Sequence, residues 1–129
     1  MRFFIDNNIA LRLARGFNEF VKGEHEVKHL RDIYEAKTPD VEWMQKLAAE
    51  PGWVILSADV RIGRNPHEIA AWKQAGHTIF FLKAGWTNID FWQQVQKLAK
   101  CFPEIVELAQ RAKLGDSFQV TVNGKIETN

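Results

Sequence analysis

Two aspartates each come directly after a hydrophobic run that predicts a buried strand. Asp6 follows residues 2–5, and Asp59 follows residues 53–58. In open α/β sheets, ligands bind outside the carboxyl ends of the strands, so carboxylates delivered there by different strands can converge on one ligand. Carboxylate oxygens are ligands that Mg²⁺ prefers. The two aspartates therefore predict a divalent-cation site at the carboxyl edge of a sheet.

Asp40 is the third acid of this predicted site. It stands at the start of a predicted helix, residues 39–50, that follows the second predicted strand through a loop. The start of such a helix opens toward the same edge of a parallel sheet. Three carboxylates repel one another when no cation lies among them, which makes a cation their natural occupant. A cation held by Asp6, Asp40 and Asp59 would activate water against a phosphodiester, so no nucleophilic side chain is required.

Three basic side chains stand close in sequence to this edge. Arg61 and Arg64 follow Asp59 in the same predicted loop, and Lys83 follows the predicted strand 78–82. Arginine and lysine bind phosphate oxygens through charge-assisted hydrogen bonds. We therefore expect these three residues to bind phosphates next to the reacting one.

Each of the acids also has a purely structural explanation. An aspartate after a strand is often a turn former or helix cap, and Asp40 after Pro39 can simply complement the helix dipole. Glu68, near the start of another predicted helix, is a fourth-acid candidate that helix-start electrostatics explains about as well. Asp32 lies in a predicted loop, where a solvated aspartate is the commoner outcome. We therefore keep the three aspartates as the core set.

Histidine and tryptophan add no second chemical signal. The four histidines are scattered without metal-ligand spacing, and a base near pH 7 is unnecessary when a metal activates water. Three of the tryptophans fall on apolar helical stripes that are typical of a core or an interface. Trp86, beside Gly85, is the candidate for stacking on an unpaired base.

The elements that must position these residues alternate along the chain. The hydrophobic pattern predicts strands over residues 2–6, 25–30, 53–57 and 78–82. It predicts helices over residues 9–21, 39–50, 66–75 and 89–111. Strands that alternate with helices indicate βαβ crossovers, and hence an α/β fold with a mainly parallel sheet and helices on both faces.

Local signals set the expected boundaries of these elements. Asn7-Asn8 is a plausible cap for the first helix, residues 31–38 and 60–65 are predicted loops, and Pro103 is expected to divide the last helix. The tail contains residues 117–122, the turn dipeptide Asn123-Gly124 and residues 125–127, which together predict a β-hairpin. We therefore expect a single domain over residues 1–129, with an α/β core over 1–112 and a C-terminal hairpin over 113–129.

Composition narrows the class of protein. The chain has 129 residues, of which 46% are hydrophobic and 26% charged, as in an ordinary globular domain. The single Cys101 excludes an intramolecular disulfide and suggests a reducing cytoplasm. No apolar run approaches the ~20 residues needed to cross a bilayer, so neither a membrane nor a secretory role is expected. The net charge of +1 neither supports nor excludes a nucleic-acid ligand.

Three segments of the chain resemble a known family. Residues 1–8 (MRFFIDNN), residues 38–43 (TPDVEW) and residues 54–59 (VILSAD), the last followed by Arg61-Ile62, look like the compact PIN-like domains of VapC-type toxins from bacterial toxin–antitoxin pairs. The resemblance covers roughly residues 1–82. It implies a PIN-like three-layer α/β/α fold with a mainly parallel sheet.

The resemblance also implies an activity. Members of this kind are metal-dependent endoribonucleases, in which acids matching Asp6, Asp40 and Asp59 hold Mg²⁺ or Mn²⁺ and activate water against RNA. It implies a cognate antitoxin, a possible homodimer and a cytoplasmic location. This chain departs from many relatives at Asn7 and Arg61, where a second acid often accompanies the first or third. That departure leaves the full metal complement and catalytic competence open.

Two other functions account for part of the pattern. A phosphoacceptor receiver domain would use Asp6, Asp59 and Lys83, but it has no role for Asp40 and ordinarily places an acid pair after the first strand. A catalytically silent PIN-like module would act only by binding a protein partner, using its aromatic residues and the edge strand of the hairpin. Saturable Mg²⁺ or Mn²⁺ binding separates the nuclease from the silent module.

Overall fold

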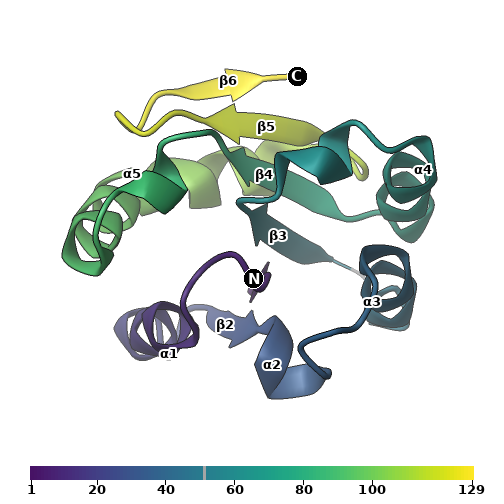
Figure 1. Cartoon of the computed structure of the whole chain (residues 1–129), viewed down its shortest axis with the longest axis horizontal. Helices are drawn as coiled ribbons and strands as arrows, with labels where there is room; N and C mark the ends of the chain where they lie inside the picture. Colours follow the sequence, from purple (N-terminus) through teal and green to yellow (C-terminus); the bar gives the residue numbers. More distant parts are fainter. Residues whose placement is uncertain (51) are drawn as a thin grey trace.

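The sheet and its flanking helices follow the predicted alternation closely. A computed structural model describes residues 1–50 and 52–129 (Figure 1). Its elements in chain order are β1 (Arg2–Ile5), α1 (Leu11–Phe20), β2 (Glu26–His29), α2 (Leu30–Ile33), α3 (Asp40–Leu47), β3 (Trp53–Ser57), the 3₁₀ helix η1 (Val60–Gly63), α4 (Pro66–Ala75), β4 (Thr78–Leu82), the 3₁₀ helix η2 (Trp86–Asn88), α5 (Phe91–Arg111), β5 (Ser117–Val120) and β6 (Ile126–Thr128).

Six strands form one mostly parallel sheet in the order β2-β1-β3-β4-β5-β6. The first five are parallel, and β6 pairs antiparallel with β5, so the predicted α/β fold with a C-terminal hairpin is confirmed. The register places Ile5 beside Leu56, so the residues that follow β1 and β3 leave the sheet at the same edge. The tail hairpin is continuous with this sheet, because β5 pairs with β4.

Alternate residues of β1, β3 and β4 point to two separate cores, one on each face of the sheet. On one face, α1 and α5 cover the sheet, and on the other face α3 and α4 do so (Figure 1). Phe3 and Phe102 belong to the first core, whereas Phe4 and Trp43 belong to the second and have ring centroids 4.7 Å apart. This arrangement explains why β3 and β4 are buried along their whole length.

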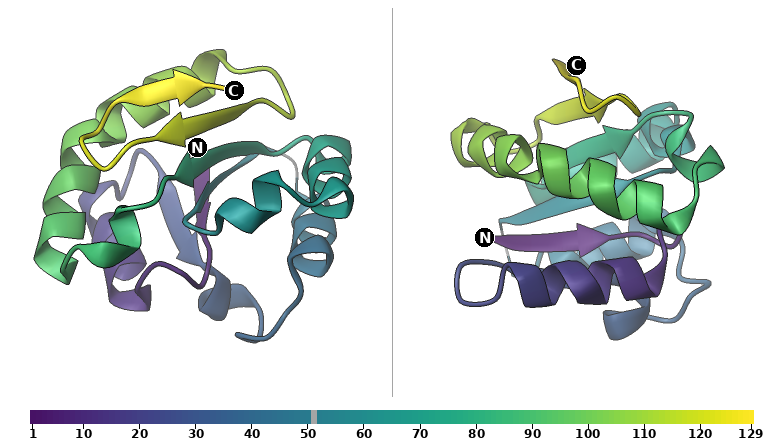
Figure 2. Two further views of the ribbon diagram at one scale, coloured as in Figure 1. Left: turned by 45° about the horizontal axis from the view of Figure 1, so that its top comes forward. Right: turned by 90° about the vertical axis from the view of Figure 1, so that its left-hand side faces the viewer.

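One crossover has the opposite hand to the others. The connections through α1, α3 and α4 wind in the right-handed sense that βαβ units almost always adopt. The connection from β4 to β5 moves toward the β6 edge, as the α4 connection does, but α5 packs on the α1 face (Figures 1 and 2). The β4–α5–β5 unit is therefore left-handed. As a result, the α4 face of β5 lies outside both apolar cores, and its residues Ser117 and Gln119 are only half-buried.

Several predicted boundaries were wrong. Helix α1 begins at Leu11, not after Asn7-Asn8, because the Asn8 amide donates to Asp6 Oδ1 (3.2 Å) and bends the chain into a turn. The predicted loop 31–38 overlaps α2, whose N-cap His29 and third residue Asp32 form a reciprocal capping box. The predicted loop 60–65 contains η1, which Asp59 caps by accepting a hydrogen bond from the Arg61 amide.

Pro103 does not divide the last helix, contrary to the sequence prediction. Helix α5 runs unbroken from Phe91 to Arg111. Proline inside a helix costs ~3 kcal/mol, but burial of one large apolar side chain returns about 1.5–3 kcal/mol. Several such residues lie in one continuous stripe on both sides of the exposed proline, namely Leu98, Phe102 and Ile105. The free energy gained by burying the stripe therefore outweighs the cost of the proline.

None of the helices in the described part of the chain is long and apolar enough to span a membrane.

Candidate active site

The carboxyl ends of β1 and β3 border a shallow pocket of about 230 Å³. The chain leaves β1 toward α1 on one face and leaves β3 toward α4 on the other, so this pocket lies at the point where the winding direction of the sheet reverses. Open α/β sheets bind ligands in the crevice at such a point. All three predicted acids line the pocket, together with Asn7, Asn8, Leu30, Ala36, Lys37, Thr38, Pro39 and Arg61.

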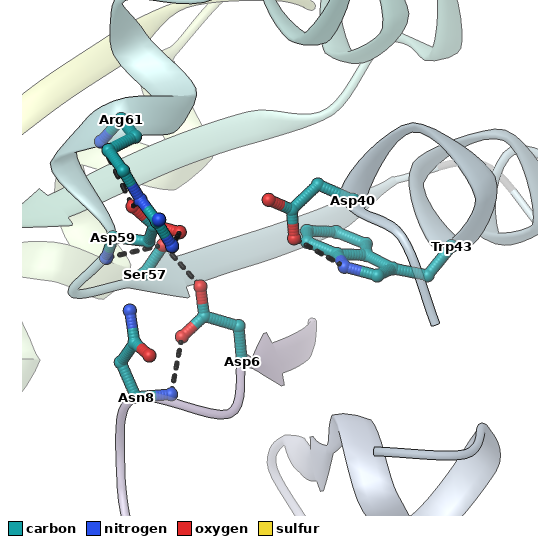
Figure 3. Close-up of polar contacts among 7 residues, drawn as sticks. All are labelled: Asp6, Asn8, Asp40, Trp43, Ser57, Asp59 and Arg61. Carbon is teal, nitrogen blue, oxygen red and sulfur yellow. Dashed lines mark hydrogen bonds and ion pairs between the residues drawn. The ribbon is translucent and has the colours of Figure 1, made fainter. Parts of the chain in front are cut away.

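Asp6 is the buried acid of the site, with 4% of its surface exposed. Its Oδ2 accepts a hydrogen bond from the Ser57 hydroxyl, and its Oδ1 accepts from the Asn8 amide (Figure 3). Burial raises the pKa of Asp6 to about 6, an effect that the two hydrogen bonds reduce and the charges of Asp40 and Asp59 increase. The ionised form of Asp6 is therefore repelled by the negative charges of Asp40 and Asp59.

Asp59 is connected to Asp6 through the hydroxyl of Ser57. The Asp59 amide donates to Ser57 Oγ at 3.0 Å, so one hydroxyl joins the ends of β1 and β3. Arg61 binds both carboxylate oxygens of Asp59, with Nε 2.9 Å from Oδ1 and Nη2 2.9 Å from Oδ2 (Figure 3). The hydrogen bonds from Arg61 hold the pKa of Asp59 below its ordinary value despite partial burial.

Asp40 is the first residue of α3, and its carboxylate points toward the other two acids (Figure 3). The indole Nε1 of Trp43, one turn later, donates to Asp40 Oδ1 at 3.0 Å. Burial raises the pKa of Asp40, and the Asp59 charge adds to this, while Trp43 and Arg61 oppose it. The helix start alone therefore does not explain Asp40, because it also interacts electrostatically with Asp6 and Asp59.

Glu68 joins the cluster from α4, which packs against α3. Burial raises the pKa of Glu68, and the charges of Asp40 and Asp59 add to the effect. Its carboxyl group lies close enough to that of Asp40 for each to affect the pKa of the other. The Oε2 atom of Glu68 is buried without a hydrogen-bond partner in the described part of the chain. The sequence offered Glu68 as a fourth-acid candidate. Among the acids of the site, Glu68 has a buried acceptor oxygen without a partner within residues 1–50 and 52–129.

The donor set suits a hard divalent cation in its chemistry. The charges of Asp40 and Asp59 raise the pKa of both Asp6 and Glu68, and an unpaired oxygen of Glu68 is buried. In the described part of the chain, however, no three His, Cys, Asp or Glu side chains lie close enough to enclose one ion. Arg61 neutralises Asp59 in this arrangement.

The predicted phosphate-binding residues divide between two places. Arg61 lines the acidic pocket and pairs with Asp59. Arg64 and Lys83 line a larger cavity of about 560 Å³ on the other side of η1. Within residues 1–50 and 52–129, neither Arg64 nor Lys83 forms an ion pair. These two side chains are therefore available to an external anion.

Other predicted candidates have structural roles. Asp32 accepts from the His29 amide and from Arg15, so it caps α2 and does not line the acidic pocket. The prediction that Trp86 stacks on an unpaired base is wrong, because its side chain is 1% exposed and donates its indole N–H to the Val120 carbonyl. His29 is buried with Nε2 2.7 Å from the Ile9 carbonyl oxygen, which agrees with the expected packing role.

Sequence reasoning missed Ser57 and Trp43 as parts of the site. Ser57 is the last residue of a strand that is otherwise apolar, a polar exception that could have marked it. Trp43 stands three residues after Asp40, the spacing at which two side chains meet on one helix face. Both are positioning residues, because they donate hydrogen bonds to acids of the site.

The fold and the site define an α/β domain with an acidic pocket at the switch point of its sheet. A family model described as PIN like domain matches residues 1–84, which include every acid of the site. The chain belongs to the PIN-like domain family. No significant match was found among curated proteins or among solved structures. The strand order β2-β1-β3-β4-β5 is also that of receiver domains, so the family match, not the strand order, distinguishes between the two.

Proposed function

We propose that this PIN-like domain is a metal-dependent endoribonuclease that cleaves RNA phosphodiester bonds. The observation that carries the proposal is the acidic cluster at the switch point, where Asp6, Asp40 and Glu68 all have raised pKa values. Packing acids together against their own repulsion destabilises a protein unless a cation uses them. Structural roles explain single acids, but they do not explain four from different elements.

In this proposal, Asp6, Asp40 and Asp59 hold Mg²⁺ or Mn²⁺, with Glu68 as a fourth acid. A bound cation of this kind lowers the pKa of a coordinated water and neutralises charge on a phosphate oxygen. Ser57 and the Asn8 amide hold Asp6 in place, and Trp43 orients Asp40. Binding would require the carboxylates to draw closer together than they are in this structure.

Arg61, Arg64 and Lys83 bind RNA phosphates in this proposal. Arg61 is at the pocket itself, and its guanidinium is largely exposed, so it can exchange Asp59 for a phosphate once a cation neutralises the acids. Arg64 and Lys83 lie beyond η1, where they bind phosphates further along the strand.

The motifs in residues 1–8, 38–43 and 54–59 support a more specific proposal, a VapC-type toxin of a type II toxin–antitoxin pair. A cognate antitoxin would then cover the acidic edge and block RNA, and the toxin would form a homodimer. Co-expression with the product of an adjacent small reading frame tests this, because a stable complex that lacks nuclease activity is expected. Growth inhibition that a neighbouring gene product does not relieve would contradict the toxin assignment.

A catalytically silent PIN-like module is the second candidate. One observation favours it: no three acids in the described part of the chain are close enough to enclose an ion. A silent module requires no saturable Mg²⁺ or Mn²⁺ binding and no cleavage. Metal titration therefore separates the two candidates.

RNA cleavage tests the proposed activity. Purified protein is incubated with labelled single-stranded RNA in Mn²⁺ or in EDTA. We expect cleavage in Mn²⁺ alone, and its loss in Asp6→Asn. The matched control is Asp32→Asn, an aspartate that caps α2 outside the pocket, and this variant should cleave normally. Cleavage by Asp6→Asn at the normal rate would overturn the assignment.

A further inference from the structure

A second cavity lies beside the acidic pocket, on the other side of η1. It has a volume of about 560 Å³ and is lined by residues of η1, α4, β4, β5 and the chain end. This volume falls within the range of ~300–1,000 Å³ that is typical of small-molecule and cofactor sites. Because α5 covers the opposite face, the cavity stays open over β5.

All the charged side chains that line this cavity are positive. Three cations line it, Arg64, Lys73 and Lys83, and no acidic side chain does. None of the three is in an ion pair with any residue in the described ranges. By contrast, Arg61 in the acidic pocket is neutralised by Asp59. Unpaired cations that surround one cavity attract an anion and lower the electrostatic cost of binding it.

The polar side chains of the cavity suit a nucleotide better than a simple ion. Ser117 and Gln119 face it from β5, and the Gln119 amide has no hydrogen-bond partner among the residues that the structure describes. An amide offers both a donor and an acceptor to a base edge. Lys83 stands at the carboxyl end of β4 and Ser117 is paired with Ile79 near its start, so the cavity extends over roughly four residues, ~13 Å of strand.

We propose that this cavity binds the RNA strand next to the cleavage point, with its phosphates on Arg64, Lys73 and Lys83 and a base against Gln119. The inference rests on the proposed function, since η1 carries Arg61 at the acidic pocket and ends at Gly63, which lines the cavity. A strand that passes over η1 would therefore have one phosphate at the acids and the next nucleotide in the cavity.

RNA binding without cleavage tests this inference separately from catalysis. Fluorescence anisotropy of a labelled single-stranded oligonucleotide is measured in EDTA, over a series of salt concentrations. The informative variant is Lys73→Ala, because Lys73 lines the cavity and not the acidic pocket. Loss of one phosphate contact to a single strand should weaken binding roughly tenfold and reduce the slope of log K against log salt by about 0.7.

A second variant changes shape without changing charge. Gly63 lines the cavity and does not have a positive φ, and the atoms nearest to a Cβ there belong to the Phe81 ring, the first at 3.5 Å, which is an ordinary van der Waals contact. Gly63→Leu therefore adds bulk to the cavity lining without backbone strain. We expect it to weaken RNA binding as Lys73→Ala does. Lys100→Ala, an exposed lysine on α5, is the control and should bind RNA normally.

The outcomes are distinct. Normal RNA affinity in both Lys73→Ala and Gly63→Leu would overturn the inference, even if the protein cleaves RNA. Weakened affinity in both variants supports the inference, even if Asp6→Asn cleaves RNA normally and so overturns the assignment of the acids. If polyglutamate binds with the same dependence on Lys73 and RNA does not bind, the cavity takes an acidic protein segment and the inference is wrong.

Discussion

Arg61 binds Asp59 through two parallel hydrogen bonds, Nε to Oδ1 and Nη2 to Oδ2, each 2.9 Å long. The two residues are separated by a single position in the sequence, and Asp59 also caps η1 through the Arg61 amide. This pair places a built-in positive charge at the acidic pocket. A divalent cation must compete with that charge for the Asp59 oxygens.

Arg61→Ala should therefore tighten Mn²⁺ binding. Without the guanidinium, the pKa of Asp59 rises, but both of its oxygens become free for the metal, and the net negative charge of the pocket increases. We expect the Kd for Mn²⁺ to fall on the order of several-fold. Calorimetric titration measures this. Arg61→Lys keeps the charge without the paired hydrogen bonds, so its Kd for Mn²⁺ should lie between those of the natural sequence and Arg61→Ala. Weaker metal binding in Arg61→Ala would contradict this prediction and show that Arg61 supports the site.

Asp6→Asn should stabilise the fold at neutral pH. The folded-state pKa of Asp6 is raised from 3.8 to about 6, so the ionised carboxylate destabilises the folded protein. This cost is absent below pH 3.8, grows between pH 3.8 and 6 and is constant above pH 6. Removing it should raise the free energy of unfolding on the order of 2–3 kcal/mol at pH 7. Urea unfolding at pH 4 and pH 7 checks the effect, and an equal gain at both would contradict the burial of a titrating Asp6.

Ser57→Ala should shift the pH dependence of metal binding upward. Ser57 donates a hydrogen bond that lowers the pKa of Asp6, so its loss raises that pKa above about 6. Protons then compete with Mn²⁺ at a higher pH. Titrations from pH 5 to 8 measure the midpoint, and Ser117→Ala, at a serine outside the acidic pocket, is the control and should leave the midpoint unchanged. An unchanged midpoint in Ser57→Ala would mean that Ser57 does not tune Asp6.

Trp43→Phe should weaken metal binding by misplacing Asp40. The substitution removes the Nε1 donor that holds Asp40 Oδ1, at a cost of about 1–3 kcal/mol in stability for the smaller buried ring and the lost hydrogen bond. Trp72→Phe is a matched control, since Trp72 is also buried and donates Nε1 to a backbone carbonyl, that of Gly115, away from the acids. Equal loss of Mn²⁺ affinity in both variants would contradict the prediction and show that Trp43 contributes only through packing.

The sequence was informative where one rule connects residue order to position. Asp6 and Asp59 follow apolar strands, and parallel strands deliver their carboxyl ends to one edge, so both acids could be placed in one pocket. Helix α2 could not be predicted, because its four residues are too few to show a helical period and its stability comes from the His29–Asp32 capping box. The left-handed crossover depends on which face α5 covers, which only tertiary packing decides.

Positioning residues were the least predictable part of the site. Ser57 and Trp43 matter through single hydrogen bonds to Asp6 and Asp40, and the direction of a side chain is set by the strand pleat and the helix phase. The pairing of Arg61 with Asp59 was hidden for a similar reason. A basic residue near an acid predicts an anion site and an ion pair equally well.

The central claim is that Asp6, Asp40 and Asp59 bind a divalent cation together, and thermal unfolding of the intact protein with and without Mn²⁺ tests it most directly. A ligand that binds only the folded state increases the free energy of unfolding, by about 2.7 kcal/mol at a ligand concentration of 100 times Kd. The Tm rises as a result. We expect a saturable rise in Tm for the natural sequence and for Asp32→Asn, and no rise for Asp6→Asn. A natural sequence whose Tm does not change with Mn²⁺ or Mg²⁺ would contradict the account.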